Sequence, residues 1–357
     1  MKVVTVVGNR PQFVKAAAVS RALRQRTDEV LVHTGQHYDD EMSAVFFAEL
    51  GVPPPTLELA LGTGSNTEQT ARMLSALAPV LERERPDCVL VYGDTNSTLA
   101  GGLAAAQARI PVAHVEAGMR SFDRAMPEEL NRVLTDHLSS LLLCSSEVPA
   151  GHLRAERVAG RIEVVGDVMV DVALLVQPRA RADDAPLRDA GVRPGEYLLA
   201  TAHRAGNVDD RERLQRLVEL LMALPLPVVL PLHPRTGARL AAAGLLDGLV
   251  AADHVRVTPP LGYLAFTALL TRAKVMLTDS GGVQKEAYLA GVPCVTLRDT
   301  TEWTETVDAG WNVLVDLDAD AALSALSRPL PPTRPPLYGD GHAGDRVVAA
   351  LRAAFGP

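Results

Sequence analysis

Residues 277–287 of the chain read Leu-Thr-Asp-Ser-Gly-Gly-Val-Gln-Lys-Glu-Ala, and the remaining sequence is best understood from this stretch. The apolar run 275–277 predicts a buried strand, and a helical pattern follows it as far as Leu289. Glycines at such a turn let a ligand approach the backbone, and Ser280 suits the helix N-cap. The free N–H groups and the helix dipole favour an anion. The stretch predicts a phosphate site at a strand end, although an ordinary strand-to-helix turn fits Ser-Gly-Gly equally well.

Continuous apolar runs of the same kind recur along the chain and alternate with segments of helical spacing. Such strands are buried on both faces, as in parallel sheets. The expected strands are residues 3–7, 29–33, 87–92, 112–115, 141–144 and 162–165, then 197–200, 228–232, 255–257, 275–277, 294–297 and 313–315. Helical patterns include residues 14–23, 67–82 and 100–108. This alternation predicts an α/β fold with two Rossmann-like, doubly wound parallel-sheet domains.

The domain boundaries follow from changes in composition. Residues 1–176 are expected to form the first domain and residues 177–336 the second, with the Pro-, Arg-, Asp- and Ala-rich segment 177–195 as the connection. A proline-rich stretch precedes an amphipathic helical pattern at 345–355. This last helix is expected to pack back on the first domain.

The bulk composition limits the classes of partner. Lys and Arg number 35 against 43 Asp and Glu, so the formal net charge is −8. This balance argues against nucleic acid or an anionic membrane as a partner. Cys88, Cys144 and Cys294 are widely spaced within apolar runs, which predicts core thiols. We find no signal-like segment and no apolar run of membrane-spanning length, so a cytoplasmic location is expected.

Polar and charged residues follow most of the expected strands. Ligands of open parallel sheets bind beyond the carboxyl ends of the strands. Because both halves contribute such residues, the sequence predicts a site in a cleft between the two domains. The residues are Arg10, Lys15, Gln36, His37, Asp94, Glu116, His203, Arg204, His233, Arg235, Asp279, Ser280, Glu286 and Arg298.

Several of these residues have an ordinary structural explanation as well. Arg10 and Lys15 can be solvated surface groups. Asp94 can serve only to cap the helix after it, and His203 can be a hydrogen-bonded core histidine.

The same holds for residues outside the strand ends. Glu128 and Glu129 follow Pro127 and can be simple first-turn acids of a helix. Trp303 can be a packing residue. The histidines interpreted as structural are His33, His114, His137 and His342.

Common cofactor and nucleophile motifs do not occur in the sequence. The segment Gly-Asn-Arg-Pro at 8–11 has one glycine where a dinucleotide fingerprint needs three. Neither a Walker motif nor a Gly-x-Ser-x-Gly elbow is found. Asp94 and Glu116 could in principle hold a divalent ion, but no compact ligand pattern accompanies them. Neither a cofactor nor a metal is therefore expected.

A series of motifs makes the chain resemble a known family, the non-hydrolysing UDP-N-acetylglucosamine 2-epimerases. The matching segments are residues 8–15 (GNRPQFVK), 34–37 (TGQH), 93–95 (GDT), 114–120 (HVEAGMR), 127–132 (PEELNR), 166–169 (GDVM), 203–204 (HR), 233–234 (HP), 279–287 (DSGGVQKEA) and 298–302 (RDTTE). They occur in the family's order and cover almost the whole chain.

The resemblance implies a fold like that of glycogen phosphorylase and the two-domain (GT-B) glycosyltransferases. It also implies a reaction, inversion at C2 of a UDP-bound 2-acetamido sugar, which interconverts UDP-N-acetylglucosamine and UDP-N-acetylmannosamine. The C2 proton is removed and UDP is eliminated, leaving 2-acetamidoglucal. UDP then adds back, and C2 is reprotonated on the other face. The resemblance implies no cofactor, and it implies that the protein forms a homodimer.

Roles follow by motif. Asp94, Glu116 and Glu128 are implied as acid/base and oxocarbenium-stabilising groups, with the order of base and acid left open, and His203 as acting on the leaving phosphate. The residues implied in substrate binding are Arg10 and Lys15 at the diphosphate, Ser280, Gly281 and Gly282 at phosphate, Glu286 at the ribose, Phe266 near uracil, and His233.

Three positions depart from the usual family pattern. The family more often has Glu where this chain has Gln12 and Gly206, and often Arg where it has Trp303. Gln12 and Trp303 resemble a branch that includes epimerases of UDP-2,3-diacetamido-glucuronate. The alternatives are therefore an epimerase of that uronate and a hydrolysing relative that releases UDP and N-acetylmannosamine. A nucleotide-sugar sensor and a glycosyltransferase are two further alternatives.

Some bacterial members of the family bind a second UDP-N-acetylglucosamine as an activator. Gln36, His37 and Arg72 match parts of that site, whereas residues 38–40 match it poorly. Allosteric activation is therefore an open possibility.

Overall fold

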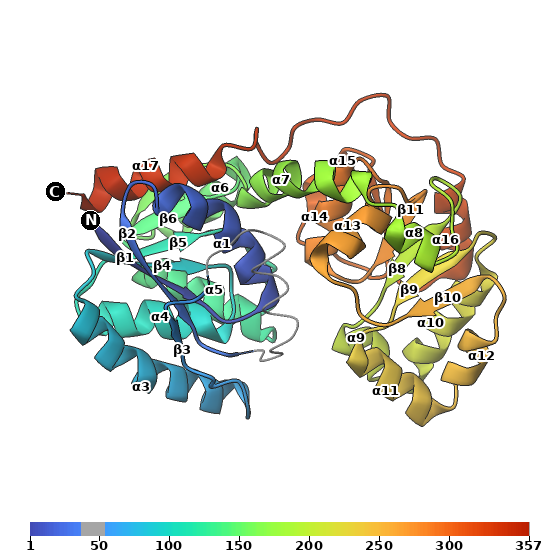
Figure 1. The fold of residues 1–357 in the computed structure, drawn as a ribbon, viewed down its shortest axis with the longest axis horizontal. Helices are drawn as coiled ribbons and strands as arrows, with labels where there is room; N and C mark the ends of the chain where they lie inside the picture. The colour runs from blue at the N-terminus through green and yellow to red at the C-terminus, as the bar shows by residue number, and fades with distance from the viewer. Residues whose placement is uncertain (37–53, 357) are drawn as a thin grey trace. The chain divides into compact units, whose positions relative to one another are not determined.

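The computed structural model describes residues 1–36 and 54–356. The chain divides into two compact units, which Figure 1 shows as ribbons. Unit 1 comprises Met1–Leu174 and Tyr338–Pro357, and unit 2 comprises Leu175–Leu337. Each unit is built around its own parallel sheet.

The sheet of unit 1 has seven described strands in the order β3-β2-β1-β4-β5-β6-β7. Their bounds are β1 Lys2–Val7, β2 Asp28–His33, β3 Leu57–Glu58, β4 Cys88–Tyr92, β5 Val112–Val115, β6 Leu141–Cys144 and β7 Arg161–Val164. In β1, Val3 lies opposite Glu29 of β2 and Cys88 of β4. Because β1 is central and covered on both faces, its sequence is continuously apolar.

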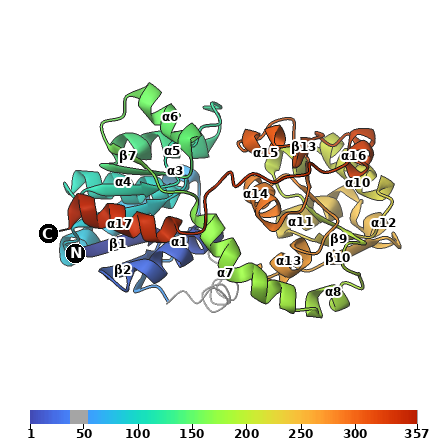
Figure 2. The ribbon, with the colours of Figure 1, turned by 90° about the horizontal axis from the view of Figure 1, so that it is seen from above.

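Helices cover both faces of this sheet. The helices of unit 1 are α1 Arg10–Leu23, α3 Asn66–Glu84, α4 Asn96–Gln107, α5 Pro127–Leu138, α6 Glu147–Glu156 and α17 Ala343–Phe355, with α7 Val168–Ala182 leading into unit 2. Met73 and Leu77 of α3 pack with Ala104 of α4 against the valines of β1, β2 and β4. On the other face α17 lies beside α1, as Figure 2 shows.

The returning end of the chain is joined to unit 1 by hydrogen bonds. The Asp171 carboxylate of α7 accepts from the backbone N–H groups of Ala343 and Gly344, at 3.1 and 2.8 Å, and so caps α17. A Cβ at Gly344 would lie 3.0 Å from the Ala18 carbonyl oxygen. Glycine therefore allows α17 to approach α1 closely.

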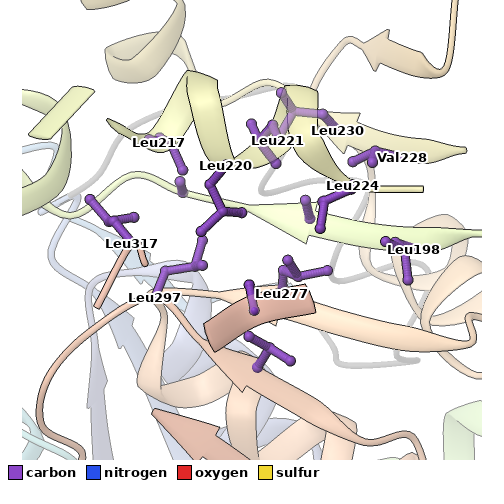
Figure 3. Packing of buried hydrophobic residues seen from close by; sticks show 14 of the residues in the cluster. Leu198, Leu217, Leu220, Leu221, Leu224, Val228, Leu230, Leu277, Leu297 and Leu317 are labelled. Carbon is purple, nitrogen blue, oxygen red and sulfur yellow. The ribbon is translucent and has the colours of Figure 1, made fainter. Parts of the chain in front are cut away.

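The sheet of unit 2 has six described strands in the order β10-β9-β8-β11-β12-β13. Their bounds are β8 Leu198–Thr201, β9 Val228–Pro231, β10 Val255–Thr258, β11 Val275–Thr278, β12 Cys294–Thr296 and β13 Asn312–Leu314. The helices are α8 Ala185–Asp189, α9 Ala205–Val208, α10 Arg211–Ala223, α11 Pro234–Ala243, α12 Leu246–Val250, α13 Tyr263–Leu270, α14 Gly281–Ala290, α15 Thr304–Asp308 and α16 Ala319–Leu326. Figure 3 shows Leu217 and Leu220 of α10 packed with Leu198, Leu277 and Leu297 in the core.

The structure confirms the expected α/β class with two parallel sheets. The short strand β3 at the edge of the first sheet was not expected, because two residues carry no readable periodicity. The connecting segment 177–195 contains the end of α7 and all of α8.

The three cysteines are buried and free, as expected for core thiols. Burial raises the pKa of each thiol to about 12. Within residues 1–36 and 54–356, no helix is both long and apolar enough to cross a bilayer.

Candidate functional site

The strand ends of unit 1 bring together a lysine and a carboxylate from distant parts of the sequence. Lys15 lies in the second turn of α1, and Glu116 lies directly after β5. Their side chains form an ion pair and are 15% and 12% exposed. Lys15 is therefore not a solvated surface group, and the partly buried position strengthens its attraction to Glu116.

The backbone of Glu116 has an unusual conformation. Its φ is +69°, which places a residue with a side chain in the left-handed region. The N–H groups of Glu116 and Ala117 both donate to the Leu143 carbonyl of β6, at 3.0 and 3.2 Å. Backbone strain of this kind persists where the surroundings hold it and often occurs at functional sites.

Asp94 follows β4 and does not cap the helix after it. The N-cap of α4 is Thr95, whose side chain accepts from the Thr98 backbone in a capping box. The Asp94 carboxylate instead accepts from the Arg132 guanidinium at 2.5 Å. The explanation of Asp94 as a helix cap is therefore wrong.

The surroundings of Asp94 alter its acidity. Burial raises the pKa of its carboxyl above the usual value, and the charges of Glu116 and Glu128 add to this rise. Arg132 and Lys15 act in the opposite direction. Glu116 and Glu128 therefore both act electrostatically on Asp94, and a carboxylate with a perturbed pKa is common at catalytic sites.

The adjacent acids Glu128 and Glu129 of α5 have different surroundings. Glu129 is buried and accepts from the backbone N–H groups of Ser121 and Phe122, at 2.9 and 3.0 Å. It also lies 3.3 Å from Arg132, so it holds the preceding loop against the helix. Glu128 is exposed, and its charge acts on Asp94. Of the pair, Glu128 is the one available to a ligand.

Two glutamines near this edge hold backbone segments together. The Gln12 side chain accepts from the Gly8 backbone at 2.7 Å and donates to the Tyr92 carbonyl at 2.7 Å. Gln36 accepts from the backbone N–H of Ser97 at 3.0 Å and from its hydroxyl at 2.7 Å. Gln12 thus joins the loop after β1 to the end of β4.

The other residues expected in unit 1 are less informative. Arg10 begins α1, and its side chain is not among the described ones. His37 lies outside the described residues. Arg72 is exposed on α3.

In unit 2 a buried carboxylate shapes the strand ends. Asp279 follows β11, and its side chain has no exposed surface. It accepts from the backbone N–H groups of His203 and Arg204, at 3.0 and 2.9 Å, and from the Asn207 amide at 3.2 Å. Asp279 therefore fixes the loop that carries His203.

His203 is not a core histidine, because its side chain is 39% exposed. Its ring stacks on the ring of His233, with centroids 5.2 Å apart. His233 is the N-cap of α11 and accepts from the backbone N–H of Arg235 at 3.2 Å. The two imidazoles expected at the site thus lie together.

Helix α14 begins at the glycines that were expected to bind phosphate. Ser280 occupies the N-cap with extended backbone, and its side chain makes no capping hydrogen bond to a described residue. A Cβ at Gly282 would meet no described atom within 4 Å, whereas one at Gly281 would lie 3.3 Å from Trp303 Nε1. The first N–H groups of a helix are unsatisfied by the helix itself and favour an anion.

Glu302 lies beside this helix start between two arginines. Its carboxylate oxygens accept from Arg204 at 3.0 Å and from Arg298 at 2.9 Å. Burial alone would raise the pKa of Glu302, but Arg298 and Arg204 outweigh it and hold the pKa below its usual value. The carboxylate therefore organises positive groups near the helix start.

The remaining candidates of unit 2 lie on α13 and α14 and in the loop before α15. Phe266 is 7% exposed within a core cluster, so little of its ring is accessible. Glu286 is half-buried on α14. Trp303 is buried, and the Lys285 ammonium lies 4.2 Å from the centre of its ring. Trp303 is therefore a packing residue, which is the structural interpretation given for it from the sequence.

Sequence reasoning assigned no role to Arg132 or Glu302, although both lie in the quoted motifs. Helical spacing could have indicated Arg132, since it follows Glu128 by one turn of α5. Nothing local to the sequence indicates that Glu302 lies between Arg204 and Arg298. Among the described residues, no group of three or more His, Cys, Asp or Glu side chains could hold a metal ion.

The chain belongs to the UDP-N-acetylglucosamine 2-epimerase family, because residues 21–352 match the model of that family. The members of this family are isomerases. The motifs quoted from the sequence lie mostly within the matched range, and the resemblance seen in them is confirmed.

Several relatives match nearly the whole chain. A UDP-N-acetylglucosamine 2-epimerase homolog of Methanococcus maripaludis is 45% identical over 99% of this chain and 99% of its own. The UDP-2,3-diacetamido-2,3-dideoxy-D-glucuronate 2-epimerase of Pseudomonas aeruginosa is 46% identical over 98% and 99%. The crystal structure of the Methanocaldococcus jannaschii UDP-GlcNAc 2-epimerase, in complex with UDP-GlcNAc and UDP, is similar with a TM-score of 0.91. It shares 41% identity over 99% of this chain and 100% of that one.

Proposed function

We propose that this chain interconverts UDP-N-acetylglucosamine and UDP-N-acetylmannosamine by inversion at C2. The observation that carries the proposal is a group of three carboxylates in unit 1, in which the charges of Glu116 and Glu128 both act on Asp94. A protein that only binds a nucleotide sugar has no need of three acid/base groups. Membership of the family supports the same reaction.

The chemistry requires groups of this kind. The C2 proton is not next to a carbonyl, so its removal needs a base held close to it. As the C1–O bond breaks, its electron pair leaves with UDP, the sugar ring gains positive charge, and a C1–C2 double bond forms. UDP then re-adds at C1 while C2 takes a proton on the opposite face. Two faces of one carbon need separate acid/base groups, which accounts for more than one carboxylate.

In this proposal the residues of unit 2 bind the UDP group. The N–H groups at the start of α14, at Ser280, Gly281 and Gly282, bind phosphate, and Glu286 binds the ribose hydroxyls. His203 stabilises the negative charge that develops on the leaving phosphate. Its 39% exposed side chain, on a loop held by Asp279, is available for that contact.

From unit 1, Lys15 meets the diphosphate. Its ammonium already pairs with Glu116, so it stands beside the group that acts on the sugar. A cation at this position favours both binding of the diphosphate and departure of UDP.

A second candidate is the epimerisation of UDP-2,3-diacetamido-2,3-dideoxy-D-glucuronate. The observation that favours it is the relative of that activity with 46% identity over nearly the whole chain. Gln12 and Trp303 resemble the same branch. The reaction at C2 is the same for both sugars, and only the groups at C3 and C6 differ.

Proton NMR in D₂O tests the reaction and the substrate together. We expect UDP-N-acetylglucosamine to incorporate deuterium at C2 while signals of UDP-N-acetylmannosamine appear. Free N-acetylmannosamine and UDP would indicate a hydrolysing relative instead. If nothing changes with this sugar but the diacetamido-uronate reacts, the second candidate is correct.

We also propose that the enzyme is a homodimer in the cytoplasm. Family resemblance supports the first statement, and the use of a UDP-sugar substrate supports the second. Light scattering of the purified protein would contradict the dimer by returning the mass of a single 357-residue chain.

A further inference from the structure

His114 is a buried histidine with no direct access to a ligand. It lies on β5, and its side chain has no exposed surface. Nδ1 lies 2.7 Å from an Asp136 carboxylate oxygen, and Nε2 lies 2.7 Å from the Gly93 carbonyl oxygen. The ring therefore connects helix α5 to the end of β4.

The partner of Nε2 fixes the direction of one of the two contacts. A carbonyl oxygen only accepts, so Nε2 donates to Gly93. Asp136 accepts on its other oxygen from Arg120 at 2.7 Å and from the Gly118 N–H at 3.1 Å. Burial alone would raise the pKa of Asp136, but His114 and Arg120 outweigh it and hold the pKa below its usual value. The Asp136 carboxylate therefore contacts His114, Arg120 and the Gly118 backbone at the same time.

His114 and Asp136 contact the two loops that carry proposed acid/base groups. Gly93 immediately precedes Asp94, and a Cβ added at Gly93 would lie 3.3 Å from both the Glu116 carboxylate and the Lys15 ammonium. Gly118 belongs to the turn in which Glu116 has its left-handed backbone. Asp136 thus holds the Glu116 turn, and His114 holds the Asp94 loop.

The third carboxylate is joined to the same unit through the helix. Glu128 and Asp136 both lie on α5, at its first turn and near its end. Asn131, between them, donates to the Asp94 carbonyl oxygen at 3.1 Å. A shift of α5 against β5 would therefore change the positions of all three carboxylates relative to one another.

We propose that the His114–Asp136 pair is a positioning unit that sets the mutual placement of Asp94 and Glu116 for proton transfer. Neither residue touches the reacting atoms. The inference rests on the proposed function and adds to it two residues that act through the carboxylates. Proton transfer is sensitive to placement, and errors of about 1 Å can cost about a hundredfold in rate.

Two substitutions at one position separate the two contacts. His114→Asn keeps an amide donor near the Nδ1 position, and His114→Gln keeps one near Nε2. The first variant retains the contact to Asp136 and loses the contact to Gly93. The second variant retains the contact to Gly93 and loses the contact to Asp136. We expect kcat to fall between about tenfold and a hundredfold in both variants. KM and the Kd for UDP should stay within about twofold, because the binding groups are unchanged.

Glu29→Gln is the matched control. Glu29 is a buried carboxylate near the amino end of β2 that accepts from Thr5 and Ser20, at 2.7 and 2.8 Å, and from Arg24 at 2.7 Å. It lies in the same sheet but at the opposite end from the carboxylates. The Glu29→Gln substitution should lower the free energy of unfolding without lowering kcat. If Glu29→Gln lowers kcat as much as the His114 variants do, or if those variants keep kcat, the inference is wrong.

Amide hydrogen exchange of the unaltered protein tests the inference without a substrate and without any variant. If Asp136 holds the Glu116 turn, the Gly118 amide should exchange with D₂O far more slowly than exposed loop amides. Exchange at the rate of an exposed amide would overturn the inference even if the epimerase is active. Slow exchange in a protein that epimerises neither UDP-sugar would instead refute the proposed function and leave the contact intact.

Discussion

The residues proposed for catalysis in unit 1 and the loop that carries His203 in unit 2 are held by different kinds of contact. In unit 1, charged side chains hold one another, as Lys15 holds Glu116 and Arg132 holds Asp94. In unit 2, a buried Asp279 holds backbone N–H groups, and α14 begins at two glycines. The acidity differs too, because the pKa of Asp94 is raised and that of Glu302 is lowered.

This difference corresponds to the two parts of the proposed reaction. Proton transfer needs a side chain that is fixed in position and direction, so its groups are braced by ion pairs. Binding of an anion needs only N–H groups and a favourable field, which a helix start supplies. Substitutions of the unit 1 carboxylates should therefore change turnover, and substitutions at the start of α14 in unit 2 should change affinity.

The largest effect is expected at the carboxylates. Glu116→Gln and Glu128→Gln should each lower kcat by about 10² to 10⁴, because an amide cannot exchange a proton with C2. The Kd for UDP, measured by calorimetry, should change little. Glu58→Gln, at an exposed position on the edge strand, is the control. If UDP binding is lost while the fold is intact, these residues serve recognition and the comparison of the two units fails.

Lys15 tests the boundary between turnover and affinity. Lys15→Ala should raise KM about tenfold, the loss expected for one charge-assisted contact to the diphosphate. Initial rates over a range of UDP-sugar concentrations measure it. An unchanged KM with a lower kcat would mean that Lys15 acts only through Glu116, to which it is paired.

Gly282 tests whether the start of α14 binds phosphate through its backbone. Gly282→Ala adds a methyl group that meets no described atom, so the free energy of unfolding should rise by about 0.5–1 kcal/mol. The same methyl group would obstruct a phosphate, and the Kd for UDP should increase several-fold. Gly248→Ala in α12 also meets no described atom and should change stability alone. Equal UDP affinity in both variants would exclude the phosphate site.

The smallest effect concerns pH. Because the pKa of Glu302 is lowered in the folded protein, Glu302 stabilises it above the usual pKa, and this contribution is lost as the pH falls. The raised pKa of Asp94 has the opposite sign, so its contribution is lost as the pH rises.

Urea unfolding of Glu302→Gln and Asp94→Asn between about pH 6 and pH 3 measures both contributions. As the pH falls, the unaltered protein should lose stability relative to Glu302→Gln and gain stability relative to Asp94→Asn. If the stability of the unaltered protein relative to each variant changes in the same direction with pH, the pKa values of the two carboxylates are not shifted in opposite directions.

The candidate site could be predicted only in part. His203, His233, Asp94 and Glu116 were identified because each follows an apolar strand, and strand ends of a parallel sheet share one edge. His114 was interpreted as structural, since a histidine within a strand carries no local sign of its partners. Its contacts with Gly93 and Asp136 come from segments about 21 and 22 residues away.

By itself the sequence determined the α/β class, most strand and helix positions and the family motifs. These depend on local hydrophobic spacing and on residue types that follow one another along the chain. Only the tertiary structure decided which of Glu128 and Glu129 is exposed, that Thr95 rather than Asp94 caps α4, and that Phe266 packs in a core. These outcomes depend on contacts between residues distant in sequence, and such contacts leave no periodic pattern in the chain.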